Sequence, residues 1–366
     1  MADLSLEVLG MKMNNPVMPA AGPPVKDAEA AKKAAEGGAG ALVTKTISVE
    51  AADVPRPNMA AIRGGFLNAE LWSEMGPEQW FEQEYPQIAE LDLPIIAGIG
   101  YSSEEIRELS ERVEEYAEAV ELSTHYLGDD PTPVEESVKA AKEACDIPVI
   151  VKLSPQVDIP MFARAAEAAG ADGLALINSL GPTLDFEVED GRPLLGSEHG
   201  YGWMSGQAIF PVALRAVYQA VTSVDIPVMG VGGIQRGIDA VKMLMVGAEA
   251  VQVCTAPILQ GPNFYGNLVE EIEAFMDEHG YKNLEELRGI ALDKLPEKDR
   301  METIPPVVTE ANCTACELCI HSCVYDAIEL NETGDYVIID KEKCAGCGLC
   351  LTRCNFDALH LSEQVQ

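Results

Sequence analysis

The sequence has little basic charge and no long uninterrupted apolar run. Only 25 Lys and Arg residues stand against 60 Asp and Glu residues, so the formal net charge is -35 at pH 7. Such a charge repels phosphates, which disfavours nucleic acid, anionic membrane surfaces and a tRNA-modifying activity. A basic partner, a salt-rich cytoplasm or solubility alone would each account for it. No apolar stretch could cross a bilayer and no basic-then-apolar leader opens the chain, so we expect a cytoplasmic protein.

Cysteine is nearly absent outside one short segment. Cys145 and Cys254 stand alone in the first three hundred residues or so, whereas the other eight cysteines lie between Cys313 and Cys354. Disulfide frameworks distribute their cysteines over the fold that they staple, and a dense cluster is more typical of metal ligation. The clustering therefore indicates a metal site in a reducing compartment.

A repeated pattern of strand and helix candidates fills most of the chain. Short apolar runs, each followed by an amphipathic stretch with helical spacing such as 102–117 or 134–145, recur between residues 16 and 256. Eight such units favour a closed (β/α)8 TIM barrel of the α/β class over an open doubly wound sheet, since no G-x-G-x-x-G opens the first helix. The strand candidates are 16–20, 41–45, 94–100, 119–123, 148–154, 173–178, 227–233 and 250–254.

The residues that follow these strands are polar or glycine. In a TIM barrel the carboxyl ends of the strands form the mouth where chemistry takes place, so candidate functional residues are expected there. Two long insertions, 47–93 and 180–207, also leave from this end, and such loops cover a substrate or bind a partner. The strand-end residues are Lys45, Thr46, Ser123, Thr124, Lys152, Asn178, Ser179, Gly232, Gly233 and Thr255.

The chain divides into three segments by composition. Residues 1–289 form the predicted barrel, whose last helix spans about 263–279. Residues 290–308 are charged and contain prolines, as expected of a linker. Residues 309–366 are predicted to form a compact ferredoxin-like α+β domain.

That last segment contains two copies of C-x2-C-x2-C-x3-C. This spacing is typical of ferredoxins with two 4Fe-4S clusters, in which the fourth cysteine of each copy ligates the other cluster. Val324 and Asn355 stand where a proline often follows the fourth cysteine. Zinc is the alternative metal, although eight cysteines in a duplicated arrangement exceed what a structural zinc site needs. The expected ligand sets are Cys313, Cys316, Cys319 and Cys354 for one cluster, and Cys344, Cys347, Cys350 and Cys323 for the other.

Glycine-rich turns after the last two strands offer a phosphate site. GVGGI at 230–234 and VQVCTAP at 251–257 expose backbone N–H groups with few side chains in the way. Tight turns also need glycine, so this signal is weak by itself.

Eight ordered motifs make the whole chain similar to a known family. The chain resembles the dihydroorotate dehydrogenase family, with the closest likeness to the FMN and iron-sulfur part of dihydropyrimidine dehydrogenase. The motifs are PAAGP at 19–23, VTKTIS at 43–48, FLNAELWSE at 66–74, VKLSP at 151–155, LINS at 176–179, WMSGQAI at 203–209, GVGGI at 230–234 and VQVCTA at 251–256.

The resemblance implies bound FMN. It would place Lys152 beside the pyrimidine edge of the flavin, where a positive charge favours the reduced anion. Either Lys45 or Lys152 could instead be an ordinary ion-pair residue, but an apolar strand is a costly place for a charge. The implied FMN contacts are Ala20, Ala21, Gly22, Lys45, Thr46, Lys152, Asn178, Gly206, Gly232, Gly233, Cys254 and Thr255.

The implied substrate site departs from the family in part. Asn68, Asn178 and Ser179 match its pyrimidine contacts, whereas Glu121 stands where an asparagine is expected and should grip a different group. Thr124 occupies the acid/base position, with the neighbouring His125 as the alternative, or proton transfer is lost. Lys45 completes the candidate catalytic residues. Trp203, where a second glycine is common, either narrows the cavity or packs on the rim.

These observations predict a flavin oxidoreductase that acts on a C–C bond next to a carbonyl in a small-molecule substrate. The electrons would pass through the clusters to or from a ferredoxin or a flavin-containing NAD(P)H-oxidising subunit, because no nucleotide fingerprint is visible in this chain. The alternative is an FMN and iron-sulfur electron-transfer subunit without turnover. The resemblance also implies that the chain can form a homo-oligomer.

Overall fold

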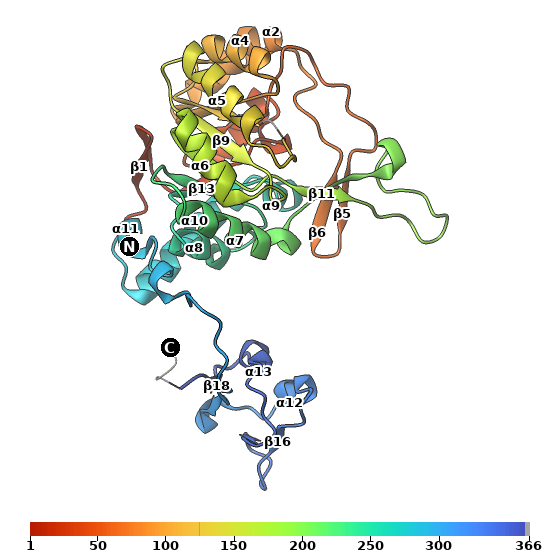
Figure 1. The fold of residues 1–366 in the computed structure, drawn as a ribbon, viewed down its shortest axis with the longest axis vertical. Helices are drawn as coiled ribbons and strands as arrows, with labels where there is room; N and C mark the ends of the chain where they lie inside the picture. Colours follow the sequence, from red (N-terminus) through yellow and green to blue (C-terminus); the bar gives the residue numbers. More distant parts are fainter. Residues whose placement is uncertain (124, 363–366) are drawn as a thin grey trace. The chain divides into compact units, whose positions relative to one another are not determined.

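The computed structural model describes residues 1–123 and 125–362, and the chain divides into two compact units. Met1–Lys294 is called the barrel unit and Leu295–Gln366 the cysteine unit (Figure 1). Residues 290–294, which the sequence predicts as linker, belong to the barrel unit. There the N–H of Ala291 donates a hydrogen bond to the carbonyl of Met245 over 3.0 Å.

Eight parallel strands form a nearly closed barrel, which confirms the predicted TIM-barrel class. Their order around the sheet is β3-β14-β13-β10-β9-β8-β7-β4. The N–H of Gly40 donates to the carbonyl of Val17 (2.8 Å) and so joins the two edges. The strands are β3 (Val17–Pro19), β4 (Leu42–Val43), β7 (Ile95–Ile99), β8 (Ala119–Leu122), β9 (Val149–Leu153), β10 (Gly173–Leu176), β13 (Val228–Val231) and β14 (Ala250–Val253).

Helices connect the strands and cover the outside of the barrel. The first turn of α4 is fixed by a capping box, in which Ser102 accepts from the N–H of Glu105 and the Glu105 carboxylate accepts in return. This helix ends at Val113 rather than near 117, because the chain must turn into β8. The helices of the barrel unit are α1 (Ala28–Glu36), α2 (Pro77–Gln79), α3 (Tyr85–Ile88), α4 (Ser103–Val113), α5 (Thr132–Ala144), α6 (Ile159–Ala169), α7 (Phe210–Val221), α8 (Gly237–Met245), α9 (Thr255–Gln260), α10 (Phe264–His279) and α11 (Leu284–Leu287).

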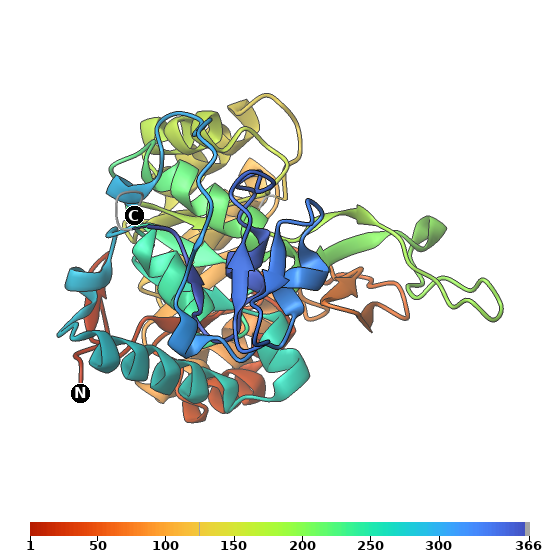
Figure 2. The same ribbon diagram turned by 90° about the horizontal axis from the view of Figure 1, so that it is seen from below.

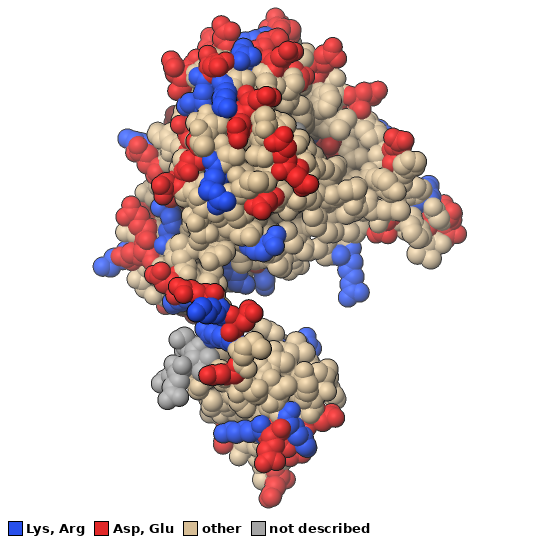
Figure 3. Space-filling view, in the orientation of Figure 1, with Lys and Arg blue, Asp and Glu red and all other residues tan. Residues whose placement is uncertain are grey.

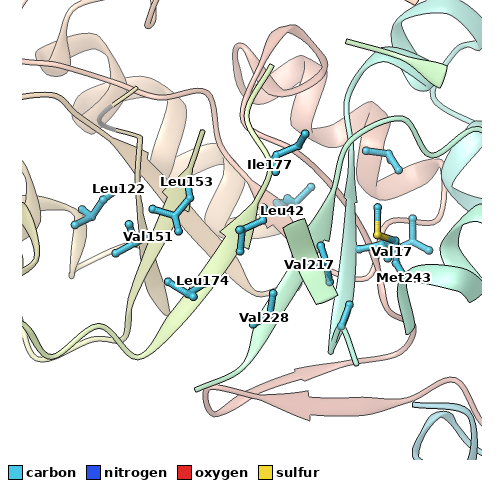
Figure 4. Close-up of a cluster of buried hydrophobic side chains, with 14 of the residues drawn as sticks. Val17, Leu42, Leu122, Val151, Leu153, Leu174, Ile177, Val217, Val228 and Met243 are labelled. Carbon is cyan, nitrogen blue, oxygen red and sulfur yellow. The ribbon is translucent and has the colours of Figure 1, made fainter. Parts of the chain in front are cut away.

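The main core lies between the sheet and these helices. Successive strand residues point to opposite faces, so every second apolar residue faces the helical layer. Val17, Leu174 and Val228 belong to this outer cluster together with Val217 of α7 and Met243 of α8 (Figure 4). The near-continuous apolar strands thus reflect burial on both faces.

The inside of the barrel is filled in layers, and the lowest layer is apolar. Every strand contributes at least one residue to a second cluster, which the hairpin of β1 (Leu6–Val8) and β2 (Met11–Met13) also enters with Val8, Met11 and Met13. Two residues further along, four of the eight positions instead carry polar side chains, namely Lys45, Glu121, Lys152 and Gln252. The members of the apolar layer are Met18, Val43, Ile96, Ala119, Ile150, Ala175, Met229 and Ala250.

The two long insertions combine into one antiparallel sheet. Its strands follow the order β11-β12-β6-β5, and Figures 1 and 2 show it projecting from one side of the barrel. Trp203 pairs with Asn68, and Ser205 pairs with Phe66, so both insertions build one wall beside the mouth. The strands are β5 (Met59–Ile62), β6 (Gly65–Asn68), β11 (Leu180–Thr183) and β12 (Gly202–Ser205).

The cysteine unit is small and has a different architecture. Two antiparallel pairs, β15 (Val307–Val308) with β18 (Leu359–His360) and β16 (Ile328–Leu330) with β17 (Val337–Ile339), accompany two short helices. The helices are α12 (Leu318–Ser322) and α13 (Leu349–Arg353). This α+β arrangement agrees with the predicted ferredoxin-like class.

Acidic side chains are spread over the visible face of the barrel unit, where they are interspersed with fewer basic ones (Figure 3). Among the described residues, no helix combines the length and the apolar character that a membrane span requires.

Candidate functional site

A cavity opens at the carboxyl ends of the barrel strands and holds about 1090 Å³ of space, counting the part open to solvent. Its walls include residues at or just after the ends of all eight strands, and residues from both insertions. All of the residues that the resemblance implies for FMN line this one cavity. They are Ala20, Ala21, Gly22, Lys45, Thr46, Lys152, Asn178, Gly206, Gly232, Gly233, Cys254 and Thr255.

The glycine turn after β13 has the features of a phosphate cradle. Gly232 and Gly233 adopt positive φ angles of 118° and 77°, and a Cβ at Gly233 would lie 2.6 Å from the backbone nitrogen of Phe210. Within the described part of the chain, neither glycine N–H has a hydrogen-bond partner. Unpaired N–H groups in a side-chain-free turn are what an anionic phosphate requires. This end of the cavity therefore fits the phosphate of FMN.

A hydrogen-bonded ion pair forms the floor of the cavity. Lys152 of β9 lies 3.0 Å from a carboxylate oxygen of Glu121, and Gln252 of β14 donates to the other oxygen over 2.6 Å. Lys152 also donates to the amide oxygen of Gln252 (3.2 Å). All three side chains are buried. Any one of them would destabilise the fold if it were buried without its hydrogen-bond partners. The network keeps one charged lysine under the space for the flavin.

The structure places Glu121, predicted as a substrate residue, below the cavity rather than in its wall. Its side chain is fully buried, faces the interior one layer below the mouth and does not line the cavity. Its two oxygens bond Lys152 and Gln252 within the interior, and the side chain has no surface exposed toward a substrate. Ser123, two residues further on the same face, reaches the cavity instead.

A second ion pair lies in the wall of the cavity. Lys45, which follows β4, contacts a carboxylate oxygen of Glu70 over 2.5 Å, and Asn58 donates to the other oxygen. The side chains of Lys45 and Glu70 are 8% and 17% exposed. Glu70 lies just after β6, within the insertion 47–93. The first insertion therefore contributes the carboxylate that pairs with Lys45.

Three predicted substrate residues line the same cavity. Asn68 is held by a hydrogen bond from its amide nitrogen to the carbonyl of Trp203 (3.2 Å). The amide oxygen of Asn178 accepts from the N–H of Ser179 over 2.8 Å. Within residues 1–123 and 125–362, the amide nitrogen of Asn178 has no partner, which leaves a donor for a ligand carbonyl.

His125 lines the cavity beside Trp203. Its ring meets Trp203 edge to face, with ring centroids 4.4 Å apart. Burial lowers the pKa of His125 below its ordinary value of 6.5, so the imidazole is neutral at neutral pH. Trp203 therefore takes part in the cavity wall. The other acid/base candidate, Thr124, lies outside the described residues.

Sequence reasoning missed several residues of this site. Gln252 is a polar residue within an apolar strand, the same signal that identified Lys152. Glu70 stands inside a motif that was recognised, but its contact with Lys45 is not visible in the sequence. Tyr101 also lines the cavity, and burial raises the pKa of its hydroxyl to about 12.

The cysteine unit contains two cavities, and each is lined by four cysteines. The cavities hold about 320 and 380 Å³, again counting open space. Within the described part of the chain, no group of three or more His, Cys, Asp or Glu residues closes on a single metal ion. The first cavity is lined by Cys313, Cys316, Cys319 and Cys354, and the second by Cys323, Cys344, Cys347 and Cys350.

The backbone around the two cavities is a structural repeat. Positive φ angles occur at the same steps of each cysteine motif, for example at Glu317 (60°) and Gly348 (75°), or at Asp326 (48°) and Asp357 (50°). Non-glycine residues adopt this conformation rarely. Its recurrence indicates that the two motifs follow the same backbone path, each around one of the two cavities.

Comparisons with known proteins agree with both units. The family model of dihydroorotate dehydrogenase matches residues 3–276, and that of the 4Fe-4S dicluster domain matches residues 312–358. The dihydroorotate dehydrogenase B (NAD(+)) catalytic subunit of Methanothermobacter thermautotrophicus is 39% identical over 303 residues, which cover 79% of this chain and 99% of that relative. The same subunit of Geobacter sulfurreducens is 37% identical over 302 residues, covering 78% and 97%.

These matches also show what the chain adds. About a fifth of it has no counterpart in relatives that are themselves covered almost completely, and the dicluster match lies beyond the barrel match. The barrel match spans well over half of the chain. The chain therefore belongs to the dihydroorotate dehydrogenase family, as a flavoprotein oxidoreductase of the class that acts on CH–CH groups and with a 4Fe-4S dicluster domain.

Proposed function

We propose that the protein binds FMN in the mouth of its barrel and adds or removes two hydrogens across a C–C bond next to a carbonyl, in a ring like dihydroorotate or a dihydropyrimidine. The observation that carries this proposal is the convergence of the twelve FMN residues, Asn178 among them, with Asn68 and Ser179 on one cavity. Relatives named dihydroorotate dehydrogenase B support the ring class.

The barrel residues have distinct roles toward the cofactor in this proposal. Gly232 and Gly233 hold the phosphate through their N–H groups, and Lys152 places a positive charge at the pyrimidine edge of the flavin. The ion pair with Glu121 fixes the position of the buried Lys152 side chain. FMN supplies the conversion between the two-electron chemistry of a substrate and the one-electron chemistry of iron-sulfur centres.

Other side chains orient the ring and move its proton. The free amide nitrogen of Asn178 donates to a ring carbonyl, while Asn68 and Ser179 offer further polar contacts. Thr124 stays the first candidate for proton transfer because of its place in the motif, and His125 is the second. His125 can accept a proton as a neutral imidazole.

The cysteine unit is proposed to hold two 4Fe-4S clusters, with the ligand sets that line its two cavities. Cys323 and Cys354 each complete the set of the other motif, as the ferredoxin pattern requires. Clusters of this kind carry single electrons. The proposed partner is a ferredoxin or a flavin-containing subunit that oxidises NAD(P)H, since the similar proteins are named as catalytic subunits of an NAD(+)-linked enzyme.

The proposal is tested by reoxidation under anaerobic conditions. The flavin of the full-length holoprotein is reduced, mixed with excess uracil, thymine or orotate, and followed by its absorbance. We expect at least one of these rings to reoxidise the flavin and to yield the dihydro product. If none does so while a redox protein does, the chain is an electron-transfer subunit and the proposal is wrong.

A further inference from the structure

Among the described residues that line the cavity, no unpaired cationic side chain is available to an anionic substrate. The charged side chains that line it are Lys45, Lys152 and Glu70, and burial keeps His125 neutral at neutral pH. Lys152 is paired with Glu121 from below, and Lys45 is paired with Glu70 in the wall. Within the described residues, both lysines thus face a carboxylate of the protein itself.

Glu70 is fixed in place. One of its oxygens contacts Lys45 and the other accepts from Asn58, while its own N–H donates to the amide oxygen of Asn68 over 3.2 Å. Asn68 is in turn bonded to the carbonyl of Trp203 across the β6–β12 pair. The carboxylate is therefore part of a connected network rather than a side chain free to swing into solvent.

A substrate ring that carries a carboxylate would bind weakly beside this network. Its negative charge would have to compete with Glu70 for Lys45 and would then lie close to an unpaired Glu70. At a separation of roughly 5 Å and an effective dielectric constant of about 20, this repulsion corresponds to roughly a 100-fold loss of affinity. An uncharged ring keeps the Lys45–Glu70 pair intact, and a ring N–H can donate to Glu70.

We propose that Glu70 determines the specificity of this site, by occupying Lys45 so that the cavity accepts an uncharged or cationic ring and excludes one that bears a carboxylate. The inference rests on the proposed function and narrows it. The substrate is then a ring amide without an acid group, in contrast to the dihydroorotate for which the relatives are named.

The test compares two ligands of the same shape and different charge. Orotate and its neutral 6-carboxamide are titrated into the oxidised holoprotein, and binding is measured by calorimetry. We expect the carboxamide to bind at least roughly 10-fold more tightly than orotate. This comparison uses the wild-type protein alone, so it decides the question even if no variant folds.

A pair of variants assigns the effect to Glu70. Glu70→Gln should keep the FMN absorbance and tighten orotate roughly 10-fold or more, with little change for the carboxamide. The matched control is Glu74→Gln in the same insertion, whose carboxylate pairs with Arg56 on the surface and does not line the cavity. It should leave both affinities unchanged.

Two failures can be told apart. If both ligands bind wild-type protein equally well, or if Glu70→Gln leaves their ratio unchanged, the specificity role is wrong although the ring site stands. If neither ligand binds any of the proteins, the ring site itself is wrong and the inference falls with it.

Discussion

The barrel unit and the cysteine unit are stabilised in different ways. The barrel unit has a large outer cluster and a separate inner cluster of buried side chains, and its cavity is shaped by residues that already bond one another. The core cluster of the cysteine unit has five buried members, two of which are cysteines that face the cavities. Small domains with so little apolar burial depend on metals or disulfides. The barrel should therefore fold before its cofactor binds, and the cysteine unit only with its iron.

The largest effect is expected in the cysteine unit, when its proposed iron ligands are removed. Replacing both buried cysteines, Cys319→Ser and Cys350→Ser, removes one ligand from each proposed cluster and two members of the core. We expect loss of most of the iron and ready proteolysis of residues 295–366, while the barrel keeps its FMN and melting temperature. Iron content, flavin content and limited proteolysis measure these outcomes.

The matched control is Cys145→Ser, in which the changed thiol is buried in the barrel unit and lines no cysteine cavity. It should retain full iron content. A double serine variant that keeps its iron, or a barrel that unfolds together with the cysteine unit, would contradict the account.

The next effect concerns the barrel unit. Glu121→Ala leaves Lys152 as an unpaired buried charge, which should lower the free energy of unfolding of the barrel by about 3–5 kcal/mol. Glu143→Ala is the control, because Glu143 forms an exposed pair with Arg107 and should change stability little. Urea unfolding followed by barrel fluorescence measures both. Equal effects of the two variants would show that the buried network does not stabilise the fold.

A smaller effect is expected on catalysis without any effect on either fold. Thr124→Ala should leave flavin and iron content intact and slow turnover by about 100-fold, the usual contribution of a positioned proton-transfer group. Steady-state rates with the ring that reoxidises the flavin provide the measurement. Unchanged turnover would remove Thr124 from this role and leave His125.

The smallest effect is a pH dependence of barrel stability. Burial lowers the pKa of His125 in the folded state below its ordinary 6.5, so the unfolded chain takes up the proton first as the pH falls. The free energy of unfolding is therefore unaffected by His125 above about pH 6.5. It decreases as the pH falls below that value, until His125 is protonated in the folded state as well. His125→Gln should remove this decline, as measured by unfolding at pH 7 and pH 5. Parallel curves for both proteins would refute it.

The sequence was sufficient for features that depend on local pattern. The eight strands, the covering helices and the cysteine spacing follow from periodicity and motif. The order of motifs predicts the flavin contacts, and those residues line one cavity. The position of Glu121 below the cavity could not be predicted. An apolar run identifies a strand but does not show in which inward layer of the barrel a polar residue lies. The Lys45–Glu70 contact and the sheet of the two insertions depend on pairing between distant segments, which no local signal encodes.

The most direct test of the account is a metal and flavin analysis of the full-length protein purified without oxygen. The account predicts about one FMN and about eight iron atoms per chain, with matching acid-labile sulfide. The cysteine variants should then lose iron and keep flavin. Colourless protein, or zinc in place of iron, would contradict the claim that one chain combines a flavin barrel with two iron-sulfur clusters.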